Sequence, residues 1–243
     1  MTLPLRFAVL LLVLNLAAGC ALFKPKEETR SAEQMWADAE KKFSKENYEK
    51  AAEDYKKLKD YHPYNPLAVS AELKLADTYF LDKKYQLAYS QYNQFRELHP
   101  THEKIPYVVY QMGMCNFQQM LSKDRDQDHT RAALKEFAVL VRMYPGNEYI
   151  PAARGKMEQC WKRLAENEYY IGKFYYKKEN YHAALRRFEK IRYLYSGLGL
   201  DWNVDRYIDL CNNAIAQEKE GKREKKLFPS LLWWKKPDER QGP

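Results

Sequence analysis

Apolar residues recur along the chain at the three- and four-residue spacings of amphipathic helices, and two stretches carry the same pattern. Residues 47–63 read NYEKAAEDYKKLKDYHP, and residues 84–100 read KYQLAYSQYNQFRELHP. In each stretch an alanine is followed four positions later by a tyrosine, three further on by a large apolar residue, and then by a proline. The first three positions lie on one helical face, and the proline ends the helix. Each stretch is therefore predicted to form one helix.

A second helix is predicted before each of these. Twelve residues before Ala51 and Ala88 the chain has another small residue, Ala39 and Ala76, and an aromatic residue follows four positions later. Small residues at such points let the two helices of a hairpin approach closely. This order of small, aromatic and proline positions resembles the tetratricopeptide repeat, whose period of about 34 residues is slightly shorter than the spacing of 37 between the two stretches.

Two more copies follow. The third has Gly113 and Ala133 as its small residues, 20 positions apart instead of 12, which places an insertion of eight residues around MLSKDRDQD. The fourth has Gly172 and Ala184 at the ordinary spacing. Hairpins of this kind bury their apolar faces by stacking, and the stack offers an extended concave surface for polypeptide segments.

Residues 150–178 are predicted to form one helix about twice the length of its neighbours, because Pro151 suits a first helical turn and no proline follows. Part of such a helix should be covered by the capping helix predicted at 201–222, or left for a partner. The predicted fold is thus an all-α, tetratricopeptide-like helix-hairpin solenoid of about five repeats. The predicted repeat domain is 31–222, with repeats near 31–63, 66–100, 106–145 and 150–196.

The first residues have a different pattern. Arg6 precedes an apolar run of about 10 residues, which is too short to span a membrane and suits a signal peptide. Three small residues then lead to Cys20, an order that looks like the lipobox of a bacterial lipoprotein. We expect residues 1–19 to be a signal peptide, Cys20 to carry the lipid, and 20–30 to be a linker. The alternative is an ordinary secretory signal with a chance cysteine.

The positive charge of the chain is concentrated near its end. The formal net charge is +8, and the window KEGKREKKLFPSLLWWKK holds seven Lys/Arg against two Glu, or +5. The positive charge therefore indicates a basic, Trp-containing tail at 223–243, and it does not indicate a groove that binds nucleic acid. This tail could lie at a membrane interface, dock in a protein groove, or be a sticky disordered end.

The sequence holds no pattern typical of catalysis, of a metal site or of a cofactor site. It lacks GxSxG, HExxH, Walker and GxGxxG sequences, and its histidines fall at predicted helix boundaries. Cys115, Cys160 and Cys211 have no metal-binding spacing. They are predicted to be buried small hydrophobic residues, with one disulfide plus a free thiol as the alternative. The chain is thus predicted not to be an enzyme.

Two candidate binding surfaces follow from the repeat geometry. Positions three before and one after each inner small residue should face the concave side, and this side is rich in aromatic residues. The candidate peptide-binding residues are Trp36, Leu73, Tyr107, Tyr110 and Met114. Arg186 and Arg187 are candidates for partner binding, because adjacent helical positions leave at least one of them exposed.

Several segments resemble one family more closely than they resemble generic repeats. LHPTHEKIPYVVYQMGMCNFQ, DRDQDHTRAALKEFAVLVRMYPGNEY and RLAENEYYIGKFYY are similar to the BamD (ComL) family of outer-membrane β-barrel assembly lipoproteins. The resemblance implies a non-catalytic scaffold, lipid-anchored in the outer membrane and facing the periplasm. Its implied partners are BamA, other BAM-complex lipoproteins and C-terminal segments of unfolded outer-membrane β-barrel proteins. The alternative is another tetratricopeptide lipoprotein, such as a pilus-secretin pilotin or a peptidoglycan-associated adaptor.

Overall fold

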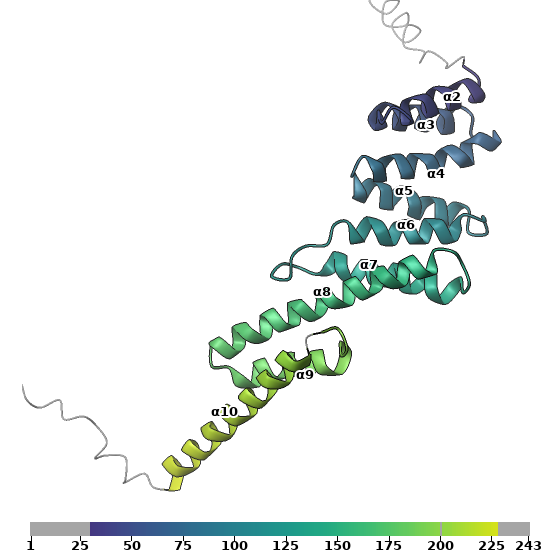
Figure 1. Cartoon of the computed structure of the whole chain (residues 1–243). Helices are drawn as coiled ribbons and strands as arrows, with labels where there is room; N and C mark the ends of the chain where they lie inside the picture. Colours follow the sequence, from purple (N-terminus) through teal and green to yellow (C-terminus); the bar gives the residue numbers. More distant parts are fainter. Residues whose placement is uncertain (1–29, 200, 228–243) are drawn as a thin grey trace, which may run out of the picture. The chain divides into compact units, whose positions relative to one another are not determined.

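The computed structural model describes residues 30–199 and 201–227, and every regular element within them is an α-helix (Figure 1). Successive helices pair as hairpins, and the fold is the predicted all-α, tetratricopeptide-like helix-hairpin solenoid. The helices are α2 (Ala32–Phe43), α3 (Tyr48–Tyr61), α4 (Pro66–Leu81), α5 (Tyr85–Leu98), α6 (Ile105–Phe117), α7 (Asp128–Met143), α8 (Ile150–Lys177), α9 (Tyr181–Leu194) and α10 (Asp201–Leu227). None of them is long and apolar enough to cross a membrane.

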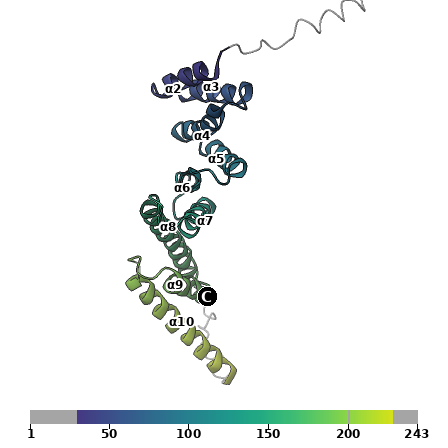
Figure 2. The same ribbon diagram turned by 90° about the vertical axis from the view of Figure 1, so that its right-hand side faces the viewer.

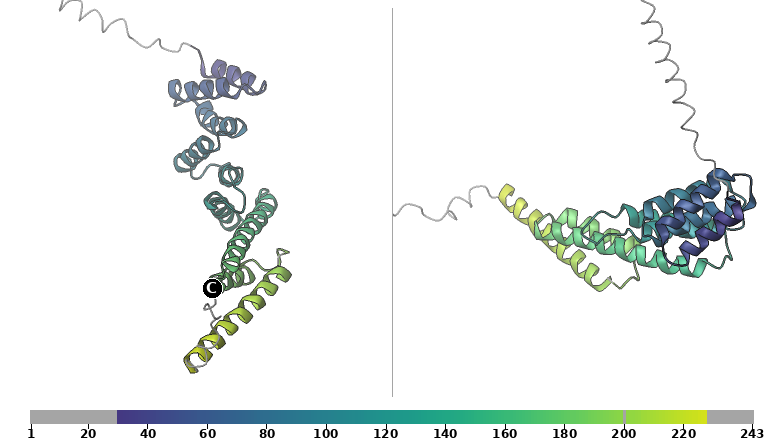
Figure 3. Two further views of the ribbon diagram at one scale, coloured as in Figure 1. Left: turned by 90° about the vertical axis from the view of Figure 1, so that its left-hand side faces the viewer. Right: turned by 90° about the horizontal axis from the view of Figure 1, so that it is seen from above.

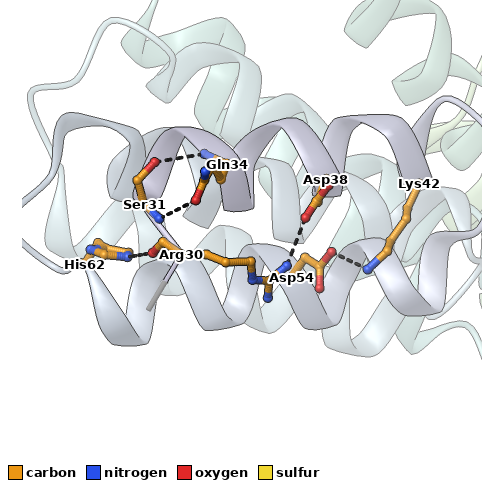
Figure 4. A network of polar contacts seen from close by, with 7 residues as sticks. All are labelled: Arg30, Ser31, Gln34, Asp38, Lys42, Asp54 and His62. Carbon is orange, nitrogen blue, oxygen red and sulfur yellow. Dashed lines mark hydrogen bonds and ion pairs between the residues drawn. The ribbon is translucent and has the colours of Figure 1, made fainter. Parts of the chain in front are cut away.

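The chain divides into two compact units within α4, between Lys74 and Leu75. In the first unit, a capping box starts α2. The Ser31 hydroxyl accepts from the Gln34 backbone N–H at 3.3 Å, and the Gln34 side chain accepts from the Ser31 N–H at 3.0 Å (Figure 4). Near the C-terminal end of α3, the His62 ring nitrogen Nε2 lies 2.9 Å from the Arg30 carbonyl oxygen. The two ends of this hairpin are therefore fastened together.

The small residues that define the repeats are buried as the sequence predicts. Every one of them, in all four hairpins, lies in the core: Ala39, Ala51, Ala76, Ala88, Gly113, Ala133, Gly172 and Ala184. In the last two hairpins the inner small residue is glycine, and a phenylalanine ring fills the space. A Cβ added to Gly113 would lie 2.5 Å from Phe137 Cε1, and one added to Gly172 would lie 2.9 Å from Phe188 Cε1. These two positions therefore need glycine for close packing.

Helix α8 is a single helix of 28 residues, as predicted, and it packs against the preceding hairpin in addition to the predicted capping helix. Its first half packs against α7 of the preceding hairpin, and its second half pairs with α9 (Figures 1 and 2). The insertion in the third repeat forms the loop 118–127, which also lies on α8. The Arg163 guanidinium donates to the Leu121 carbonyl at 2.6 Å, and the Asn167 amide donates to the Lys123 carbonyl at 2.7 Å. Sequence periodicity alone does not show that one hairpin packs over a helix of the next.

Helix α10 packs along α9 and closes the second unit (Figure 3). Its Tyr207 ring stacks on Phe188 with centroids 4.8 Å apart, and it meets the Tyr169 and Tyr176 rings of α8 edge-on. The helix extends to Leu227, beyond the predicted end at 222, because no proline occurs before Pro229. The predicted signal peptide, Cys20 and the end of the predicted tail lie outside the described residues.

Candidate peptide-binding site and partner surface

Two of the predicted peptide-binding residues belong to a cluster of tyrosines in the second unit. Tyr107 and Tyr110 lie one turn apart on α6, and both contact Tyr149, the residue that precedes α8. The Tyr110 and Tyr149 rings stack at 5.3 Å, and the Tyr107 and Tyr149 centroids are 5.7 Å apart. Tyr92 of α5 meets Tyr107 edge-on at 6.4 Å. These four rings form the tyrosine cluster, in which all but the fully buried Tyr92 are partly exposed.

A single carboxylate, that of Asp77, holds two tyrosines of the cluster in place. The Tyr92 and Tyr107 hydroxyls both donate to Asp77 Oδ1, at 2.6 and 2.8 Å, and Gln111 donates to the Tyr107 hydroxyl at 2.9 Å. Burial, with the negative charge of Asp77, raises the pKa of both phenols above its ordinary value. Both hydroxyls therefore remain protonated donors at neutral pH. The rings are held in fixed orientations, which suits a preformed surface for an apolar side chain.

The first hairpin contains a similar arrangement. The Tyr55 hydroxyl donates to Glu40 at 2.6 Å, and Lys74 pairs with the same carboxylate at 3.0 Å. The Trp36 ring packs edge-on against Tyr55 with centroids 5.6 Å apart. A carboxylate directly after the small residue thus fixes a tyrosine on the next helix in both of the first two hairpins.

The predicted peptide-binding residues are only partly brought together. Met114 is half-buried on α6, further along the helix from Tyr110. Trp36 and Leu73 are also half-buried, but they belong to the first unit. A groove that runs from Trp36 to Tyr110 therefore stays a prediction. Tyr149 is not among the predicted residues, because it lies in a turn outside the repeat pattern. The only sequence signal near it is Pro151, two positions later.

Arg186 and Arg187 have different surroundings. Arg186 is exposed, whereas Arg187 donates to the largely buried Glu168 carboxylate at 2.8 Å, and Lys190 pairs with the same group. Burial alone would raise the pKa of Glu168, but the hydrogen bonds from Lys190 and Arg187 outweigh it and lower that pKa. Both arginines line a pocket of about 270 Å³ beside Tyr175. Arg186 is therefore available to a partner, and Arg187 also joins α9 to α8.

The three cysteines of the repeat body are buried and free. Burial raises the pKa of Cys115 to about 12 and that of Cys160 to about 11, and it also raises the pKa of Cys211. Their thiols are therefore protonated and unreactive at neutral pH, as expected of small core residues. No group of histidine, cysteine and acidic residues that could hold a metal ion occurs within residues 30–199 and 201–227.

Comparison with known proteins finds a matching family and several similar proteins. A family model described as "YfiO: Outer membrane lipoprotein" matches residues 28–219. The outer membrane protein assembly factor BamD of Neisseria meningitidis serogroup B is 31% identical over 171 residues, which are 66% of this chain and 64% of that protein. Its serogroup A counterpart is 30% identical over 204 residues, covering 79% and 74% of the two chains. The crystal structure of MamA protein aligns over 81% of this chain and 94% of MamA, with 20% identity and a TM-score of 0.39.

Proposed function

Because the chain belongs to the YfiO family of outer membrane lipoproteins, we propose that it is a non-catalytic scaffold of outer-membrane protein assembly. The observation that carries this proposal is the extent of the family match, which includes all four hairpins and most of α10. Assembly factors named BamD are among its relatives. In this role the chain binds the periplasmic domains of BamA and the C-terminal segments of unfolded β-barrel proteins.

A lipid on Cys20 would hold the scaffold at the periplasmic face of the outer membrane. The order of apolar run, small residues and cysteine supports this anchor. With the anchor at the start of the chain, a linker of about ten residues separates the membrane from α2. The repeat body can therefore reach substrate in the periplasm while it stays attached.

The tyrosine cluster is the proposed contact for the substrate segment. Such a segment is extended and ends in an aromatic residue, as the family resemblance implies. Tyr110 and Tyr149 present stacked, half-buried rings, and ring–ring contacts with a further aromatic side chain contribute about 0.5–1.5 kcal/mol each beyond area burial. The fixed hydroxyls of Tyr92 and Tyr107 keep this surface preformed, so little ordering is needed on binding.

Tyr110→Ala is expected to weaken binding of a synthetic β-barrel C-terminal peptide by about tenfold, because it removes one of the two stacked rings. Fluorescence anisotropy with the labelled peptide measures the effect. Tyr193→Ala removes an 86% exposed ring elsewhere and is expected to leave the affinity unchanged. Unchanged affinity in Tyr110→Ala, or an equal loss in both variants, would remove the tyrosine cluster from the proposal.

Arg186→Glu is expected to weaken binding of the BamA periplasmic domains by about fivefold without changing thermal stability, because this arginine is exposed. Arg187→Glu is expected to reduce stability by about 1–2 kcal/mol, because it breaks the pair with Glu168 and places two carboxylates together. Pull-down and thermal melting of each variant measure the two effects. Arg142→Glu, an exposed reversal on α7, serves as the control. Full binding by Arg186→Glu would exclude this surface.

A further inference from the structure

A second pocket, separate from the tyrosine cluster and from Arg186, lies between α8 and the loop 118–127. It has a volume of about 230 Å³ and is lined mainly by residues of α8. Positions 166, 170, 173 and 177 recur there at helical spacing, so they share one face. The Arg187 and Lys190 pairs with Glu168 hold α9 on another face of the same helix. Hairpin packing therefore leaves this pocket open.

The apolar part of this pocket consists of three rings. Tyr170 is 47% exposed and Phe174 is 53% exposed, so both rings are accessible to an occupant of the pocket. Tyr169 also lines the pocket, and edge-on contact with Phe188 fixes its ring. The volume is below the range of about 300–1,000 Å³ that is typical of small-molecule sites. The pocket thus suits one large side chain of a longer polypeptide.

The rim of the pocket is positively charged. Lys123, Lys173 and Lys177 line it, and no ion pair within the described residues involves any of them. The single lining acid, Glu166, is paired with Arg163 at 3.5 Å. The ammonium group of Lys173 lies over the Tyr169 ring, 5.7 Å from its centroid. An occupant with negative charge beside an apolar side chain would complement this rim.

The insertion in the third repeat contributes to the pocket. Lys123 belongs to the loop 118–127, and its carbonyl oxygen accepts a hydrogen bond from Asn167 of α8. Arg163 holds the neighbouring Leu121 carbonyl in the same way. Asp124, the next residue, is exposed and does not line the pocket. The eight additional residues of this repeat thus place a lysine opposite the aromatic side chains of α8.

We propose that this pocket, formed by α8 and the inserted loop, binds an acidic polypeptide segment of a partner protein through one aromatic or large aliphatic side chain. The three lysines would pair with carboxylates on either side of that side chain, and Tyr170 and Phe174 would cover it. A membrane surface is less suitable, because a hollow of about 230 Å³ fits one side chain of such a segment. The inference does not depend on the scaffold function proposed above.

The test measures the affinity of a labelled peptide for the whole chain in mild detergent. The peptide has one phenylalanine, with glutamate and glycine residues on both sides of it. Lys123→Glu with Lys177→Glu is expected to lower the peptide affinity by at least about tenfold, because two attractions become repulsions. Both positions are exposed, so folding should be retained. Lys135→Glu with Lys162→Glu makes the same charge change at exposed sites outside the pocket and is expected to change the affinity less than about twofold.

A second pair of measurements separates the apolar contribution from the charge. Phe174→Ser in the protein, and phenylalanine to serine in the peptide, are each expected to lower affinity by about fivefold or more. Equal losses in the pocket and control reversals would overturn the proposal, because they would indicate general charge attraction. The proposal would also be overturned if the peptide did not bind and the pocket reversal instead abolished binding to micelles containing phosphatidylglycerol. The site would then belong to a membrane surface.

Discussion

Ala88→Asp is expected to destabilise the second hairpin by about 3 kcal/mol or more, the largest loss that we expect from one substitution. Ala88 is completely buried in the first turn of α5, at the repeated small position that the sequence predicts. A carboxylate there would be buried in the core. Urea unfolding followed by circular dichroism measures the loss as a lower midpoint. Because the protonated acid is less costly to bury, the loss should become smaller as the pH falls towards about 4.

The control for this substitution is Ala138→Asp. Ala138 is exposed on α7, so the same change there costs only helix propensity, about 0.7 kcal/mol. A midpoint of Ala88→Asp close to that of Ala138→Asp, at both neutral and acidic pH, would mean that the second hairpin does not pack in the predicted register.

Gly113→Ala is expected to be the second most damaging change. An added Cβ would lie 2.5 Å from Phe137 Cε1 and 2.7 Å from its Cδ1. Phe137 is completely buried and its ring contacts Tyr110, so it has no free space into which it could turn. Overpacking costs about 1–3 kcal/mol, and a contact as short as 2.5 Å with a buried ring should place the cost in the upper part of that range, above the roughly 1 kcal/mol gained by replacing a helical glycine with alanine. The urea midpoint should therefore fall.

Gly155→Ala provides a matched control with the opposite expected sign. Gly155 also lies within a helix, but apart from its chain neighbours and the backbone of its own helix no atom lies within 4 Å of the position where its Cβ would be. The substitution should therefore raise stability by about 0.5–1 kcal/mol through helix propensity alone. If both glycine variants were stabilised, the close contact between α6 and α7 at Gly113 would not exist.

The hairpins could be predicted from the sequence because each depends on local information. Alanine or glycine at fixed spacing, with an aromatic residue four positions later, determines which faces of the two helices meet. The length of α8 was predictable for a similar reason, since no proline interrupts it after Pro151. Even the insertion before Ala133 was visible as a change of spacing, and it forms the loop 118–127.

The surroundings of individual site residues could not be predicted, because they depend on contacts between distant parts of the chain. Tyr149 joins the tyrosine cluster from a turn 39 positions after Tyr110. Arg187 has the same sequence signal as Arg186, yet only Arg187 pairs with Glu168, and Glu168 lies on another helix. The cover of the first half of α8 likewise comes from α7 and the loop 118–127. Periodicity shows which face of a helix is apolar, but it does not show what packs there.

The most direct test of the scaffold function is purification of the tagged chain from cell envelopes, with identification of the proteins that co-purify. The Cys20→Ala variant, which cannot carry the proposed lipid, is processed in parallel and should be lost from the membrane fraction. We predict that BamA is the principal protein that co-purifies with the lipid-bearing chain. A secretin or a cell-wall enzyme in its place, with no BamA, would contradict the proposed role in outer-membrane protein assembly.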